Sequence, residues 1–286
     1  MTDTMTDAFV RTPASSANLG AGFDVLAMAL DVYADCGLGT APPDSQQLDE
    51  HHPGRLAFEA LGGTGPMWMR CNIPMARGLG FSGAARVGAA SLAAVQAAGT
   101  PCTQTITDAA DRILSLATDL EGHGDNAAAS LHGGVTAYID GKVVAIDIGP
   151  TMAAASFVAW IPEVTTSTDA SRKTLGPDVA RSDAVFNIGR SIQFVAAFQQ
   201  DDPSLLVGAA DDRMHQQHRL PLVPGAADAL EAGVGAGAWA GWLSGSGPTV
   251  GFFCAADLAG AIESVLPSNG HVKVLSIDAR GTRVES

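Results

Sequence analysis

The 286-residue chain has few of the features that assign a sequence to a special class of protein. Its four cysteines stand far apart, with no CxxC and no histidine pair at metal-ligand spacing, which argues against a zinc site and indicates reduced core thiols. No apolar run reaches the roughly 20 residues that a membrane helix needs. The polar, acidic start "MTDTMTDAFV" is unlike a signal peptide. We therefore expect a soluble, cytoplasmic protein.

Positive charge is also scarce. The chain has 16 Lys and Arg against 30 Asp and Glu, a formal net charge of −14. A surface this acidic argues against nucleic acid or an anionic membrane as the main partner, although a few arginines inside a cleft can still attract an anionic substrate. Hydrophobic residues make up 47% of the chain, which indicates a folded globular protein.

The remaining pattern predicts a folded chain of two parts. Two β-rich runs flank Asp140-Gly141, a turn dipeptide, and predict a hairpin over residues 134–148. An alanine-rich helix is expected from Gly83 to just before Gly99, and a second helix over residues 108–120. We place the boundary near residues 150–162, with one domain at 1–155 and another at 156–286.

The stretch "ARGLGFSGAARVGAAS", residues 76–91, carries the clearest chemistry. Closely spaced glycines let backbone N–H groups converge, and the following helix start adds partial positive charge, which together favour a phosphate. Gly78 to Gly83 also match GxGxxG, the fingerprint of a dehydrogenase, but "PMAR" separates the loop from its strand and no carboxylate follows before Asp108. Glycines that only permit tight helix packing are the structural alternative.

Three further stretches place polar residues around glycine turns. "PASSANLGAGFDVLAMAL" (13–30) offers the amide of Asn18 and the carboxylate of Asp24. "EGHGDNAAASLHGG" (121–134) gathers Glu, His, Asp and Asn before a helix, and "LSGSGPTVGFF" (243–253) is a Gly/Ser turn between strands. Each alone is compatible with ordinary capping or turn formation.

Together with "STDASRKTL" (167–175), "SDAVFNIGR" (182–190) and "DRMHQQHR" (212–219), these stretches resemble the motifs of the homoserine kinases, a family of the GHMP small-molecule kinase superfamily, in the same order. The resemblance implies an α+β fold of two domains, the first like a ribosomal-protein domain and the second ferredoxin-like. It also implies ATP-dependent phosphorylation of the side-chain hydroxyl of L-homoserine, a step of threonine biosynthesis. The chain departs from the superfamily's GLGSSAA pattern at Phe81 and Gly83.

The same resemblance assigns the nucleotide and metal sites. ATP would be held by the loop residues Arg77, Gly78, Leu79, Gly80, Phe81, Ser82 and Gly83, with backbone N–H groups around its phosphates. Mg²⁺ would be held by Ser82 and Glu121. From the residues alone, Ser82 could instead cap the helix, and Asp119 is an alternative to Glu121.

For L-homoserine the resemblance assigns Asn18, Asp24, His123, Asn126, Arg172 and Arg219. The two guanidinium groups suit the substrate carboxylate, and Asp24 suits its ammonium group. His123 and Asn126 are the predicted catalytic residues, since they could orient the reacting hydroxyl, and none of the set is an obvious strong base. ATP and L-homoserine are the expected partners, and a homodimer is left open.

Two alternatives stay open at this point. The same fold could act on another hydroxy acid, such as threonine or mevalonate, or it could bind nucleotide without turnover. Phe81 bears on the second alternative, because its ring cannot donate to a phosphate as a serine hydroxyl could. Its backbone N–H is unaffected, so we expect the ring to turn onto apolar neighbours and the loop to keep working.

Overall fold

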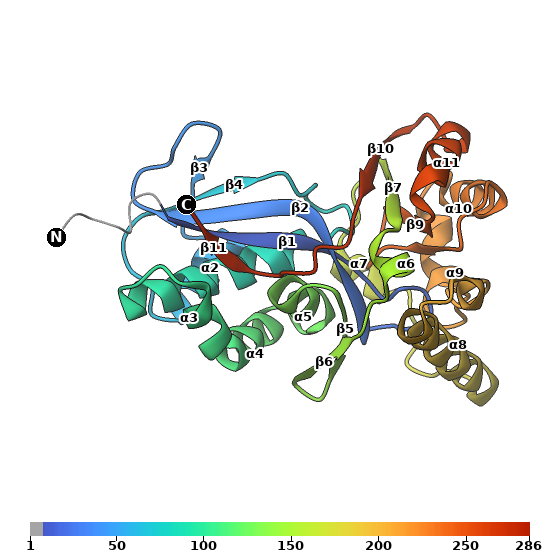
Figure 1. Cartoon of the computed structure of the whole chain (residues 1–286), viewed down its shortest axis with the longest axis horizontal. Helices are drawn as coiled ribbons and strands as arrows, with labels where there is room; N and C mark the ends of the chain where they lie inside the picture. The colour runs from blue at the N-terminus through green and yellow to red at the C-terminus, as the bar shows by residue number, and fades with distance from the viewer. Residues whose placement is uncertain (1–7) are drawn as a thin grey trace.

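The computed structural model describes residues 8–286, which form two sheets side by side, each with its own helices (Figure 1). The first sheet has seven strands in the order β11-β1-β2-β4-β3, with β5 on β2 and β6 on β5. These strands are β1 (Phe9–Ala17), β2 (Leu26–Leu38), β3 (Gln46–Gln47), β4 (Met67–Cys71), β5 (Val135–Ile139), β6 (Lys142–Ile146) and β11 (Arg283–Glu285). All pairings are antiparallel, so the dehydrogenase alternative, which needs a parallel sheet, is wrong.

Helices α2 to α5 lie on one face of this sheet (Figure 1). The helices of this half are α1 (Pro53–Ala60), α2 (Phe81–Ala98), α3 (Thr103–Asp108), α4 (Ala110–Glu121) and α5 (Asp125–His132). Helix α2 approaches β1 closely because small residues face the strand; a Cβ added to Gly88 would lie 2.7 Å from Thr12 Oγ1. The helix predicted over residues 108–120 is present as α4, with the short α3 before it.

The second sheet has four antiparallel strands in the order β10-β7-β9-β8. They are β7 (Ser156–Pro162), β8 (Ala240–Leu243), β9 (Val250–Cys254) and β10 (Gly270–Leu275). The helical segments of this half are α6 (Pro150–Ala153), α7 (Thr168–Arg172), α8 (Arg181–Gln200), η1 (Pro203–Leu206), α9 (Gln216–Arg219), η2 (Leu220–Leu222), α10 (Ala226–Gly235), η3 (Ala256–Leu258) and α11 (Ala259–Val265).

The two halves pack against each other, and the chain returns from the second half to the first at its end. One buried cluster joins residues of the first sheet, such as Met28, to Phe157 and Trp242 of the second. The last strand, β11, returns to the first sheet and pairs with β1. The division at residue 155 stays a prediction: the second sheet begins at Ser156, but the chain's end lies with the first.

Local turn chemistry agrees with the sequence in the hairpin of β5 and β6. Asp140 and Gly141 both have positive φ, 48° and 80°, as a two-residue turn of this kind requires.

Among the described residues 8–286, no helix is both long and apolar enough to cross a bilayer.

Candidate active site

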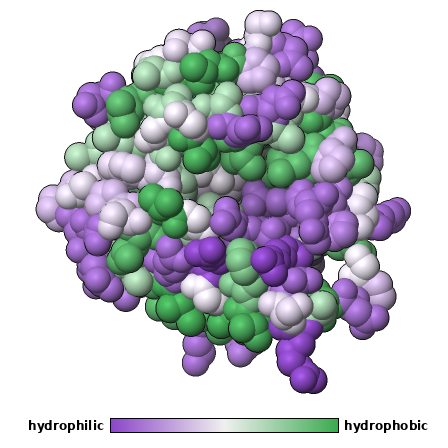
Figure 2. Space-filling model, turned by 90° about the vertical axis from the view of Figure 1, so that its right-hand side faces the viewer, coloured by the Kyte–Doolittle hydropathy of each residue, from purple (hydrophilic) through white to green (hydrophobic). Residues whose placement is uncertain are grey.

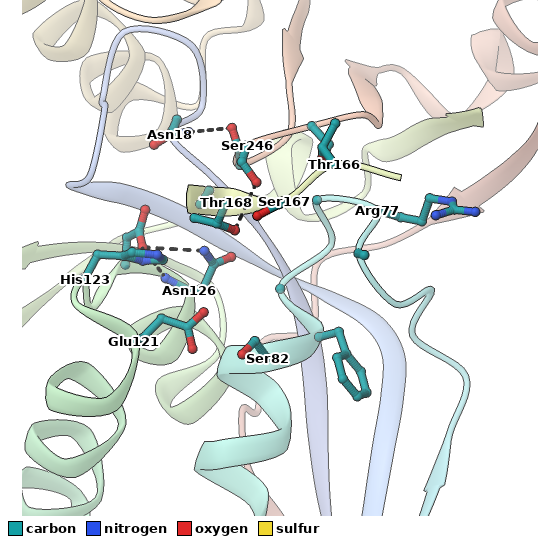
Figure 3. A pocket seen from close by; sticks show the side chains of 18 of the residues that line it. Asn18, Arg77, Ser82, Glu121, His123, Asn126, Thr166, Ser167, Thr168 and Ser246 are labelled. Carbon is teal, nitrogen blue, oxygen red and sulfur yellow. Dashed lines mark hydrogen bonds and ion pairs between the residues drawn. The ribbon is translucent and has the colours of Figure 1, made fainter. Parts of the chain in front are cut away.

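A cavity of 390 Å³ opens where loops of the two halves meet (Figure 3). Two predicted site residues do not line it: Leu79, which is fully buried, and Gly83. All the others do: Asn18, Asp24, Arg77, Gly78, Gly80, Phe81, Ser82, Glu121, His123, Asn126, Arg172 and Arg219. The fold thus brings together residues from motifs that are far apart in the sequence, with Asn18 the first and Arg219 the last.

The loop before α2 turns its carbonyl groups into the protein. Three of them accept hydrogen bonds at 2.6 to 3.3 Å from the β8–β9 segment and from β1, namely those of Arg77, Gly78 and Leu79. Helix α2 has Gly80 as its N-cap, no capping side chain and no acidic residue in its first turn. The alternative in which Ser82 caps the helix is therefore wrong. The first N–H groups of α2, which lack intrahelical acceptors, are free to bind an anion at this edge of the cavity.

Two glycines of this loop are required by close approach as well as by backbone conformation. Gly78 and Gly80 have φ of 75° and 68°. A Cβ on Gly78 would lie 2.3 Å from the carbonyl oxygen of Ser244, and a Cβ on Gly80 would lie 2.1 Å from Ser15 Oγ. The glycines therefore press the loop against both sheets and fix its position.

Phe81 packs as predicted. Its ring is partly buried against the main core, and it meets the ring of His52 edge-on at a centroid distance of 6.0 Å. The apolar side chain thus has partners in the protein, and its backbone N–H stays in the first turn of α2.

Ser82 and Glu121 face the cavity from α2 and from the end of α4 (Figure 3). A residue missed by the sequence reasoning joins them: Arg86, one turn after Ser82, donates from Nη1 to both Ser82 Oγ and the Glu121 carboxylate. Asp119, the alternative ligand, is exposed and does not line the cavity. The geometry therefore favours Glu121.

His123 and Asn126 lie side by side at the start of α5 (Figure 3). Asp125, which is buried, holds both: its Oδ1 lies 3.0 Å from His123 Nδ1 and accepts the N–H of Asn126 at 2.8 Å. Burial lowers the pKa of His123, but the hydrogen bond and charge of Asp125 outweigh it, so the pKa is raised. The oxygen of Asn126 accepts a hydrogen bond from Ser15 at 2.8 Å, which fixes the amide's orientation.

Asp24 and Arg172 form a bidentate ion pair at the cavity. The two hydrogen bonds are 2.6 and 2.8 Å long, and both side chains are about one third exposed. The hydrogen bond to Asp24 raises the pKa of Arg172. Two groups predicted to bind opposite ends of the substrate are thus paired with each other, and a zwitterion could insert its own charges between them.

Arg219 differs from Arg172 because, among the described residues 8–286, no carboxylate pairs with it and its Nε has no hydrogen-bond partner. It is 2% exposed, and its Nη1 makes long contacts there, 3.4 Å to the carbonyl of Gly245 and 3.5 Å to His215 Nδ1. Burial, followed by the charge of Arg172, lowers the pKa of Arg219 to about 10. A buried cation with an unpartnered donor on a cavity wall is a strong site for an anion.

Asn18 shapes the site through contacts with the protein. Its Nδ2 donates to the carbonyl of Gly245 at 2.9 Å, and its Oδ1 accepts the N–H of Asp24 at 3.0 Å. It therefore ties the β1–β2 turn to the β8–β9 turn and sets the position of Asp24. Arg77 is also engaged, since its guanidinium donates to the carbonyl of Glu163 at 2.8 Å and points away from Ser82 (Figure 3).

The sequence reasoning missed several other groups. Phe23 lies beneath both substrate-site arginines, with its ring centre 5.6 Å from the Arg172 guanidinium and 5.1 Å from that of Arg219. The hydroxyl-rich segment Thr166 to Thr168 and Ser246 close the cavity from the second half (Figure 3). Phe23 lies in the motif of residues 13–30 and Ser246 in that of residues 243–253. Their places in these motifs could have indicated that they belong to the site.

Comparisons with known proteins identify the family. The model of the GHMP kinases N terminal domain matches residues 53–134, and the model named GHMP kinases C terminal matches residues 194–272. The chain is 38% identical to a homoserine kinase of Moorella thermoacetica, with 86% of each chain covered. It is 37% identical to a homoserine kinase of Streptomyces coelicolor, covering 96% of this chain and 93% of the relative.

Solved structures agree as well. The crystal structure of a homoserine kinase from Cytophaga hutchinsonii superposes with a TM-score of 0.82 at 25% identity, over 100% of this chain and 99% of that one. A mevalonate kinase shares the fold, with a TM-score of 0.69 at 11% identity. The predicted α+β GHMP kinase fold is confirmed, and the chain belongs to the homoserine kinase family of the GHMP kinases.

Proposed function

We propose that the protein transfers the γ-phosphate of ATP to the side-chain hydroxyl of L-homoserine, the activity named for its relatives. The observation that carries the substrate assignment is Arg219, a buried arginine on the wall of the cavity whose Nε has no hydrogen-bond partner within residues 8–286. A carboxylate that reaches it would satisfy that donor and neutralise the charge.

The amino-acid part of the substrate fits the remaining charges. The ammonium group of homoserine would share Asp24, and its carboxylate would lie between Arg172 and Arg219, so that the ion pair already present becomes part of a four-charge arrangement. Phe23 keeps both guanidinium planes in place from below. A hydroxy acid without an ammonium group, such as mevalonate, would leave Asp24 without a new partner.

The residues of this chain can contribute to phosphoryl transfer mainly by positioning the two substrates. The helix start of α2 binds the phosphates through its N–H groups, and His123 and Asn126, both held by Asp125, orient the hydroxyl. Because the transition state of phosphoryl transfer is loose, alignment and charge neutralisation can suffice without a strong base.

The oxygen donors of Ser82 and Glu121 fit Mg²⁺ chemically, since this hard cation prefers oxygen ligands and keeps waters and phosphate oxygens. Within the described part of the chain, no group of three His, Cys, Asp or Glu could hold a metal unaided, so the nucleotide would complete the site. Bound there, Mg²⁺ would neutralise charge on the transferring phosphate.

An assay of ATP consumption against homoserine, threonine, serine and mevalonate tests the proposal. Homoserine should be the preferred acceptor. ATP binding without turnover of any acceptor would instead favour the non-catalytic alternative.

The cytoplasmic location and a homodimer stay predictions. The end of the molecule that carries α8 to α11 mixes hydrophilic and apolar patches (Figure 2). On α8, Val185, Ile188 and Ile192 are 60 to 64% exposed at helical spacing, an apolar stripe of the kind that a second copy could cover. Sedimentation velocity would measure the oligomeric state.

A further inference from the structure

Arg86 connects the two residues expected to hold Mg²⁺. Its guanidinium reaches Ser82 Oγ on its own helix and the Glu121 carboxylate at the end of α4. The side chains of Arg86 and Glu121 are only 16% and 13% exposed, so the pair is largely shielded from water. Both partners of Arg86 line the cavity, so its guanidinium lies next to the cavity although Arg86 is not among the lining residues.

This contact has a consequence for metal binding. A metal ion held by the same two oxygens would lie beside the same Nη1, and two cations cannot share these ligands at contact distance without strong repulsion. If the guanidinium were released with nothing to replace Glu121, a largely buried charge would be left unpaired, which is costly. The triphosphate of the nucleotide supplies a new anion at the start of α2, one turn from Arg86.

We propose that Arg86 is an internal counter-ion that competes with Mg²⁺ for Ser82 and Glu121 and is released to the phosphates when the nucleotide binds. The metal then enters with ATP and binds poorly to the protein alone. Arg86 contacts phosphate in the complex and so belongs to the nucleotide site. This inference rests on the proposed use of Mg·ATP.

The first test measures metal binding without nucleotide. Mn²⁺ serves as the probe, and its free concentration is followed by electron paramagnetic resonance for wild type and Arg86→Gln. We expect the variant to bind Mn²⁺ about 10- to 100-fold more tightly, the range set by losing one charge-assisted interaction with the competitor. Equal or weaker binding by the variant would overturn the proposal.

Arg55→Gln is the matched control. Arg55 pairs with Glu59 at 2.6 Å on α1, is 19% exposed and lies outside the cavity, so its removal changes the net charge equally. Its Mn²⁺ affinity should stay within about twofold of wild type. The double variant Arg86→Gln/Glu121→Gln should lose the gain in affinity. A gain that persists there would place the metal elsewhere and contradict the proposal.

The second test measures ATP binding in EDTA by calorimetry. If Arg86 moves to the phosphates, Arg86→Gln should bind metal-free ATP about tenfold or more weakly than wild type, and Arg86→Lys should recover part of the loss. Unchanged affinity in Arg86→Gln would overturn the release step. Thermal melts establish that each variant is folded. Neither test uses homoserine, so a wrong acceptor assignment leaves their outcome unaffected, whereas wild type that binds no ATP would contradict the proposed function itself.

Discussion

Arg219 and Arg172 line the same cavity but differ in the partners of their guanidinium groups before any substrate binds. Arg172 already has a carboxylate partner, Asp24, whereas in the part of the chain that the structure describes no carboxylate pairs with Arg219 and its Nε is unpartnered. An incoming substrate carboxylate therefore gives Arg219 a hydrogen-bond acceptor and a counter-charge that it lacks. At Arg172 it only rearranges the ion pair that Asp24 already forms. The two positions should respond differently to the same substitution.

We predict that Arg219→Ala lowers kcat/KM for homoserine by roughly 10- to 150-fold, the equivalent of about 1.5–3 kcal/mol for one charge-assisted hydrogen bond. Arg172→Ala should lose less, because it frees Asp24 for the ammonium group. The KM for ATP should barely move in either. Steady-state kinetics with both substrates varied decides the matter, with Arg190→Ala on α8 as a control outside the cavity. An ATP KM that rises as much as the homoserine KM would show that the carboxylate assignment is wrong.

The raised pKa of His123 gives a pH-dependent prediction. A histidine whose pKa is higher in the folded than in the unfolded state contributes stability that is complete below its ordinary pKa of about 6.5 and is lost as the pH rises through the folded pKa. The melting temperature of wild type should therefore exceed that of His123→Gln by more at about pH 5.5 than at about pH 9. A difference that grows with pH would contradict the raised pKa. The titration of His123 itself can be followed by NMR.

At the scale of elements, the α2 segment combines helix-start electrostatics with a tight fit. Gly80 and Gly99, at the two ends of α2, have nearly the same φ, 68° and 67°. A Cβ on Gly80 would collide with Ser15 Oγ, whereas nothing lies within 4 Å of one on Gly99. Substitutions at Gly80 and Gly99 therefore separate the cost of a left-handed backbone conformation, which both share, from the cost of a steric clash, which only Gly80 has.

We expect Gly99→Ala to cost about 1–2 kcal/mol of stability from the left-handed conformation alone, with ATP affinity unchanged. Gly80→Ala should be less stable than Gly99→Ala and should weaken ATP binding by about tenfold or more, since the loop must move. Denaturant titration and calorimetry measure the two quantities. Equal ATP affinity in both variants would mean that the loop position does not set the phosphate site.

Phe81→Ser restores the residue usual at this place in the superfamily motif and tests whether the loop is a working variant. Because the ring packs on the core and on His52, its loss should cost about 1–3 kcal/mol of stability. ATP affinity should be kept or improved, and Ser82→Ala should instead remove most activity. Wild type that binds no Mg·ATP until Phe81 is replaced would establish the non-catalytic alternative.

For the molecule as a whole, the sequence predicted the motifs, one hairpin and two helices, but not the contacts between elements. The hairpin at Asp140-Gly141 and the helices α2 and α4 follow from local periodicity and turn chemistry, and these are present. The pairing of β11 with β1 joins the two ends of the described chain, from Phe9 with Glu285 to Arg11 with Arg283. Because these residues are so far apart in the sequence, no local pattern predicts their pairing.

The candidate site shows the same limit. Motif resemblance selected many, but not all, of the cavity-lining residues, and charge chemistry suggested that Arg172 and Arg219 would act alike. Only the packed structure shows that Asp24 forms an ion pair with Arg172 and not with Arg219. It also shows that Arg86 bridges Ser82 and Glu121. These pairings join side chains from separate elements, so their geometry arises from tertiary packing.

Transfer of phosphate from ATP to the homoserine hydroxyl can be observed directly in its product. The most direct measurement incubates the protein with Mg·ATP and, separately, homoserine, threonine, serine or mevalonate, and identifies the products by phosphorus NMR and mass spectrometry. We predict O-phosphohomoserine, with kcat/KM for homoserine at least about tenfold above that for any other acceptor, because homoserine is the acceptor named for the relatives of this chain. Preferred phosphorylation of mevalonate or threonine, or no phosphorylated product despite bound ATP, would contradict it.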